Sequence, residues 1–186
     1  MPTDRSEANN WLAAAFLTGA VVVVLLGVYS RYHLGTGDAV ALLFFSDQLK
    51  MKTWLALIAG LFAVFQLVSS LVIYSKIRIR PFPRWIVDGH RLAGLLAFFF
   101  SLPVAYHCLW SIGFNWDLDA PARVLIHSVT GLLFYGGYVA KVMVVRVKGM
   151  PKWAVPVTGG FIFATLILAL LTSVIFGFSN FSEGLF

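Results

Sequence analysis

Five long apolar stretches constrain this chain more than any other feature of its sequence. They cover residues 11–30, 54–74, 92–112, 124–145 and 153–176, and the third contains Pro103, where a local bend is expected. Each stretch has about 20 residues or slightly more, the length of helix that crosses the ~30 Å hydrocarbon core of a bilayer. Lipid offers no hydrogen bonds to an exposed backbone, so such segments must be helical. The sequence therefore predicts an all-α integral membrane bundle of five transmembrane helices, in a single domain over residues 1–186.

The composition points to the same class. The chain is 60% hydrophobic and only 12% charged, whereas soluble domains have roughly 25% charged residues. Its one cysteine, Cys108, excludes an intramolecular disulfide and a cysteine-based zinc or iron–sulfur site within the chain. The first ten residues are polar and mixed in charge, and the apolar stretch after them is long enough to span, so no cleavable signal peptide is expected. A multi-pass protein of the plasma membrane, surrounded by the lipid bilayer, is predicted.

Basic residues gather in two of the four connections between these stretches. They are Lys76, Arg78, Arg80, Arg84 and Arg91 in one, and Arg146, Lys148 and Lys152 in the other. The alternate connections, residues 31–53 and 113–123, carry acidic and basic residues together. Because basic loops stay on the cytoplasmic side, the N-terminus is predicted to be cytoplasmic and the C-terminus outside. This topology explains most of the net charge of +6, so no nucleic-acid partner is expected.

The four histidines, His33, His90, His107 and His127, are the residues most suited to chemistry. An ionisable side chain inside a spanning helix is costly and is therefore a functional hypothesis. His107 lies near the outer end of the third predicted helix, and His127 lies about one and a half turns into the fourth. Antiparallel neighbours bring them to similar depth, where two imidazoles can ligate a haem iron from opposite faces. The sequence predicts one haem b in the outer leaflet, with His107 and His127 as metal ligands.

Two neighbours of His127 fit the same prediction. Gly131 follows it by four residues and places a small residue where a porphyrin or another helix must come close. Arg123 precedes it by four residues, at the outer interface, and is a candidate partner for a haem propionate. The alternatives are that Arg123 is only a positive residue at a helix start, and that each histidine only caps a helix or bonds across the bundle.

His90 is expected to behave differently from this pair. It lies 17 residues before His107, about 25 Å along a helix, which places it at the cytoplasmic surface of the membrane. The same separation turns the helix by roughly −100°, away from a common face unless the helix bends. No second histidine lies on that side, and only Met143 or Lys141 could approach, so a second, inner haem at His90 is disfavoured. His90 with Arg91 fits equally a propionate, quinone or proton-exchange site, or a basic edge facing anionic lipid.

Polar side chains in the second predicted helix are expected to bond between helices. They are Gln66, Ser69 and Ser70. Inside a membrane such groups usually bond across a helix interface. The alternative is that these three residues line a quinone pocket.

The segments around the two histidines also carry a resemblance. Residues 102–110 (LPVAYHCLW) and 123–128 (RVLIHS), followed by Gly131, resemble an uncharacterised family of five-helix membrane proteins from actinobacteria. The resemblance covers most of the chain from about Lys52 and implies a fold and a kinship without an activity. More distantly, the pattern is similar to transmembrane cytochrome b and ferric-reductase-like proteins, which pass electrons through bis-histidine haems. This chain departs from them in helix number, in the 17-residue spacing and in lacking four ligand histidines.

The predicted function is that of a membrane-embedded, cytochrome b-like haem b protein. It would pass electrons between a quinol, or an external redox partner, and haem, and any enzymatic role would be as a component of an oxidoreductase system. The alternative is a haem-free accessory or assembly subunit of a larger membrane complex, such as a respiratory complex. In that case small residues of the fourth and fifth helices would dock a partner helix: Gly131, Gly136, Gly137, Gly159 and Gly160.

Overall fold

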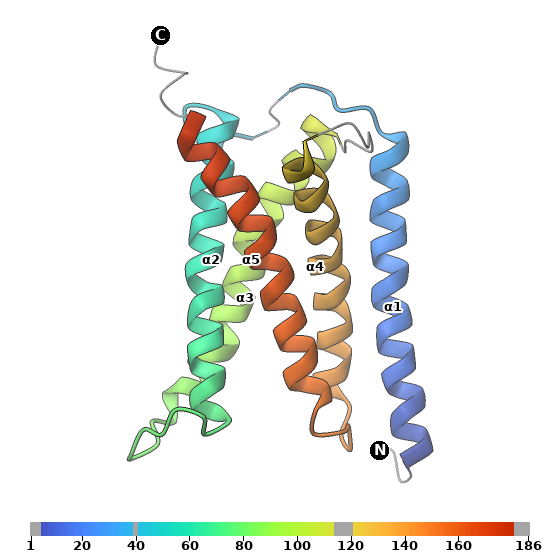
Figure 1. The fold of residues 1–186 in the computed structure, drawn as a ribbon, viewed down its shortest axis with the longest axis vertical. Coiled ribbons are helices and arrows are strands. Elements are labelled where there is room, and N and C mark those ends of the chain that lie inside the picture. Colours follow the sequence, from blue (N-terminus) through green and yellow to red (C-terminus); the bar gives the residue numbers. More distant parts are fainter. Residues whose placement is uncertain (1–4, 39–40, 114–120, 181–186) are drawn as a thin grey trace. The chain divides into compact units, whose positions relative to one another are not determined.

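The computed structural model describes residues 5–38, 41–113 and 121–180. Five helices in it are long and apolar enough to cross a membrane (Figure 1). They are α1 (Arg5–Tyr32), α2 (Gln48–Ile73), α3 (Trp85–Tyr106), α4 (Ala122–Arg146) and α5 (Ala154–Asn180), and α3 continues into the π-helix η1 (His107–Ile112). The prediction of an all-α chain with five helices of spanning length is confirmed.

The helices extend beyond the apolar stretches that predicted them. α1 begins at Arg5 instead of residue 11, α2 at Gln48 instead of 54, and α3 at Trp85 instead of 92. Hydropathy marks only the part of a helix that lies in hydrocarbon, whereas the helix itself continues through the polar headgroup region. One consequence corrects a prediction, because His90 and Arg91 lie inside α3 and not in the connection before it.

Large apolar side chains are exposed on the outside of these helices. Leu17 and Leu25 of α1 are 67% and 62% exposed, and Leu61 of α2 and Ile175 of α5 are each 64% exposed. A monomeric soluble protein rarely exposes apolar surface on this scale. Such side chains suit the hydrocarbon of a bilayer, so the chain has the construction of a multi-pass membrane protein.

The chain divides into two compact units, and the division falls inside α5. The first unit contains Met1–Leu34 and Gly113–Ala169. In it α1 packs against α4, and their backbones approach closely where Gly19 faces Gly136. A Cβ atom at Gly19 would lie only 2.6 Å from the Gly136 carbonyl oxygen. Small residues allow this approach, which brings the two helices into backbone contact.

The second unit contains Gly35–Ile112 and Leu170–Phe186. In it α2 and α3 pack as an antiparallel pair, with the rings of Phe62 and Phe100 stacked at 5.9 Å. The last part of α5 packs on the start of α2, where the Trp54 and Phe178 rings meet edge to face at 5.7 Å. Because α2 and α3 run antiparallel, the first residues of α2 lie beside the last residues of α3.

A π-helix, η1, begins four residues after Pro103, and the bend expected at Pro103 stays a prediction. Pro103 lacks a backbone N–H and so breaks the regular hydrogen-bond pattern of α3. The N–H of His107, four residues later, bonds to the carbonyl oxygens of both Pro103 and Val104. The connection between α1 and α2 caps the last carbonyl groups of η1. The Thr36 N–H bonds to Trp110 O at 3.1 Å, and the Gly37 N–H bonds to Ser111 O at 2.9 Å. π-Helical turns are rare and frequently lie at functional sites.

Candidate functional site

His107 is the most completely buried histidine of the chain and is held by one nitrogen. Its side chain is 2% exposed, and its Nδ1 lies 2.8 Å from the Pro103 carbonyl oxygen. A carbonyl only accepts, so Nδ1 carries the proton, and the neutral ring has its lone pair on Nε2. Nε2 is buried and has no hydrogen-bond partner among the described residues. A histidine that ligates a metal has this arrangement, with the second ring nitrogen donating to a carbonyl.

His127, in the first unit, shares with His107 a hydrogen bond from Nδ1 to a backbone carbonyl. It lies near the start of α4, and its Nδ1 is 3.0 Å from the Ala169 carbonyl oxygen of α5. Since this carbonyl also only accepts, the proton again lies on Nδ1 and the lone pair on Nε2. The two histidines singled out by the sequence therefore share one tautomer, set in each case by a backbone carbonyl.

The two neighbours of His127 lie on the same helix. A Cβ atom placed at Gly131 would meet no described atom within 4 Å, so space lies open beside this residue. Arg123 is half-buried in the first turn of α4. Both positions fit the roles predicted for them, and both roles stay predictions.

His90 forms part of the contact between α2 and α3. Its Nδ1 lies 2.8 Å from the Ser69 hydroxyl, and its carbonyl oxygen accepts a hydrogen bond from the Gln66 side-chain amide. Gly94 leaves room for this amide, because a Cβ there would lie 2.6 Å from Gln66 Nε2. The expectation of bonds between helices is confirmed for Gln66 and Ser69. It is wrong for Ser70, whose hydroxyl bonds within α2 to Leu67 O at 2.7 Å. His90 is half-buried in this cluster. A residue on a solvated basic edge, one of the expected alternatives, would be more exposed.

Two further buried groups in the second unit were not predicted from the sequence. Gln48 Nε2 and Ser111 Oγ are buried and, within the described ranges, have no hydrogen-bond partner. Ser111 is 2% exposed. Isolated serines and glutamines carry no pattern that marks a site. The one available signal was the four-residue spacing that places Ser111 one turn after His107.

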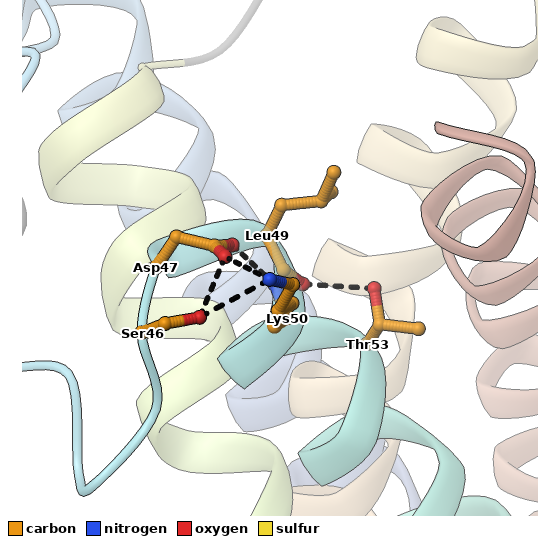
Figure 2. A network of polar contacts seen from close by, with 5 residues as sticks. All are labelled: Ser46, Asp47, Leu49, Lys50 and Thr53. Atoms are coloured by element: carbon orange, nitrogen blue, oxygen red, sulfur yellow. Dashed lines mark hydrogen bonds and ion pairs between the residues drawn. The ribbon is translucent and has the colours of Figure 1, made fainter. Parts of the chain in front are cut away.

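A network of polar contacts fixes the start of α2, directly before Gln48 (Figure 2). The Asp47 carboxylate accepts the Lys50 N–H at 2.8 Å and pairs with the Lys50 ammonium at 3.3 Å. Ser46 donates to the same carboxylate at 3.1 Å. The hydrogen bond from the Lys50 N–H is the main cause that lowers the pKa of the Asp47 carboxyl below its usual value. Asp47 is therefore a charged N-cap that fixes where Gln48 enters the helix.

Metal ions and haem require different sets of side-chain ligands from a protein. Within residues 5–38, 41–113 and 121–180, no three histidine, cysteine or carboxylate side chains come together as a metal-binding group. A zinc ion needs three or four protein ligands. A haem iron takes its equatorial ligands from the porphyrin and needs only axial ones from the protein. Single, separately oriented histidines such as His107 and His127 therefore fit haem.

Comparison with known proteins places the chain in a family. Residues 12–184 match a family of unknown function, DUF6529. The chain belongs to this family. Membership in DUF6529 agrees with the resemblance to an uncharacterised membrane family, and it extends over nearly the whole sequence. No functionally curated protein and no solved structure matches the chain.

Proposed function

We propose that this DUF6529 member is a membrane-embedded haem b electron-transfer protein, in which His107 and His127 would hold the haem iron. The observation that carries the proposal is the buried lone pair of His107 Nε2, which no described group satisfies. Haem b, when bound, supplies a one-electron change at its iron. The partners proposed for the exchange are a quinol or an external redox protein.

The chain's own part in this function is to orient and tune the two ligands. The Pro103 carbonyl fixes the His107 ring through Nδ1, and the Ala169 carbonyl fixes the His127 ring. Such bonds set the tautomer and make Nε2 a stronger ligand. Burial in an apolar surrounding and these hydrogen bonds are the means by which a protein sets the reduction potential of a haem.

The spectra of histidine variants test this proposal. We expect the purified protein to show the sharp α-band of a six-coordinate haem in the reduced-minus-oxidised spectrum. His107→Ala and His127→Ala should each abolish this band or convert it to a five-coordinate form, and added imidazole should restore part of it. His33→Ala is the matched control, because His33 stacks on Tyr29 at 5.0 Å and is given no ligand role. An unchanged α-band in both ligand variants would refute the assignment.

The proposed topology places the N-terminus in the cytoplasm, the C-terminus outside and His107 in the outer half of the membrane. It rests on the basic residues of the α2–α3 connection, among them Arg78 and Arg80. In a Cys108→Ser background, an impermeant maleimide should label Asp38→Cys in intact cells. It should label Ile77→Cys only after permeabilisation. The reverse pattern would overturn this orientation.

The accessory-subunit alternative has weaker support from the glycines that suggested it. Gly136 faces Gly19 of α1, and a Cβ at Gly137 would lie 3.0 Å from the Phe161 ring. These two glycines thus serve packing within the chain. Gly131 and Gly160 remain open, since a Cβ at either meets no described atom within 4 Å. A colourless protein that co-purifies with a stoichiometric membrane partner would favour this alternative.

A further inference from the structure

Three buried polar atoms of the second unit have no hydrogen-bond partner among the described residues. They are His107 Nε2, Ser111 Oγ and Gln48 Nε2. Nearly all buried polar groups in native proteins are satisfied, so each such atom calls for an explanation. A bound group that reaches all three would explain them together.

The register of α2 against α3 places these residues at one end of the pair. Ser69 of α2 contacts His90 of α3, with 2.8 Å between the hydroxyl and Nδ1. Gln48 lies 21 residues before Ser69, and Ser111 lies 21 residues after His90. In antiparallel helices with the same rise per residue, equal steps in opposite directions end at the same level. The path to Ser111 is α-helical except for its last residues in η1, where the rise per residue is smaller, so Gln48 lies near the level of Ser111, with His107 about one turn away.

The chemistry of the three atoms describes what would bind there. The Gln48 amide nitrogen can only donate hydrogen bonds, and the Ser111 hydroxyl can donate one. His107 Nε2 offers a lone pair instead, because Nδ1 holds the ring proton. A group with an acceptor oxygen satisfies both Gln48 and Ser111, since the serine hydroxyl can donate to it, and an electron-pair acceptor about one turn away satisfies His107.

The charges at the start of α2 largely balance one another. Gln48 is the first residue of this 26-residue helix, whose N-terminal end carries a partial positive charge. The Asp47 carboxylate beside it is neutralised in part by the Lys50 ammonium at 3.3 Å. The Lys50 ammonium and the N-terminal end of α2 thus offset the Asp47 carboxylate, so that an oxygen acceptor at Gln48 meets little net repulsion.

We infer that Gln48 and Ser111 bind a propionate carboxylate of the haem whose iron His107 ligates. This inference rests on the proposed function. Haem b combines an iron that accepts the His107 lone pair with carboxylates on one edge of the porphyrin, which matches the two requirements. Gln48 and Ser111 are thus assigned as haem-positioning residues at the α2–α3 end.

Haem and haem dimethyl ester, in which both propionates are esterified, test the inference. We expect the full-length protein in detergent to bind the ester about tenfold more weakly than haem, because a hydrogen bond to a charged group is lost. The double variant Gln48→Leu/Ser111→Ala should bind haem about tenfold more weakly and no longer distinguish haem from its ester. The propionate carboxylate bands in redox-induced infrared difference spectra should shift in this variant. Helical circular dichroism checks that it is folded.

Ser70→Ala is the matched control for the loss of a serine hydroxyl. The Ser70 hydroxyl bonds within its own helix, to Leu67 O at 2.7 Å, so this variant should keep the affinity and infrared bands of the parent protein. If the parent binds haem and its ester equally well and the double variant leaves both readouts unchanged, the inference is wrong and the ligand assignment stands. That result would assign the buried donors to water. A protein that binds no haem would overturn both.

Discussion

Asp47 shows how a single side chain prepares the site. Its carboxylate caps α2 through the Lys50 N–H at 2.8 Å, and the next residue is Gln48. Asp47→Ala should lower the free energy of unfolding by about 1 kcal/mol, because an N-cap bond is lost. Asp47→Asn keeps a capping oxygen and should cost less. Thermal unfolding of both variants in detergent measures the difference, and equal losses would contradict the capping role.

The same carboxyl group gives a pH dependence with a definite sign. Its pKa is lowered in the folded protein, chiefly by the Lys50 N–H, so the folded state favours the charged form. The contribution to stability is therefore present above the carboxyl pKa of the unfolded chain, and it is lost as the pH falls through the lower folded value. Below about pH 4 the parent protein and Asp47→Asn should converge in melting temperature. A difference that persists or grows in acid would oppose this account.

At the scale of the elements, the contact between α1 and α4 depends on two glycines. Gly19→Ala would place a Cβ 2.6 Å from the Gly136 carbonyl oxygen, and a backbone atom has little freedom to move aside. We expect a loss of roughly 1–3 kcal/mol, as is usual for overpacking. Gly160→Ala is the control, because no described atom lies within 4 Å of its Cβ position. It should be neutral or slightly stabilising, since alanine favours helix. A Gly19→Ala variant as stable as the control would contradict the packing.

The elements also show what could be predicted from the sequence. Length and hydropathy were enough to find all five helices, because a bilayer admits few other structures. They were not enough to find the helix starts, since hydropathy does not mark residues at the interface. In the structure the start of α2 is set by Asp47, whose side chain accepts the Lys50 N–H as an N-cap. The π-helix after Pro103 depends on hydrogen bonds that only the folded helix pair defines.

The candidate site was predictable only in part, because some of its groups have no distinctive sequence signal. His107 and His127 stood out because ionisable residues are rare in spanning segments. The carbonyls that set their tautomers could not be predicted, because any backbone can supply them. Gln48 and Ser111 are common residue types, and only their burial without a described partner makes them notable. His90 was expected at the membrane surface. Its contact with Ser69 depends on how α2 and α3 are aligned, which the sequence does not specify.

For the whole molecule, the account predicts one haem in each chain. His90 Nδ1 bonds to Ser69 at 2.8 Å, within a cluster that also holds Gln66, so we give His90 a packing role and no iron. His90→Ala should therefore leave the haem content unchanged at one per chain, while it lowers stability by about 1 kcal/mol through the lost hydrogen bond. Haem and protein assays on one sample measure the ratio. A ratio near two that falls to one in His90→Ala would show that an inner haem exists.

The absorption spectrum of the protein, purified from haem-replete cells, is the decisive test of haem binding. The account predicts a Soret band and a sharp α-band on reduction, in proportion to one haem per chain. A folded protein that is colourless from such cells, and stays colourless after titration with haem, would contradict it.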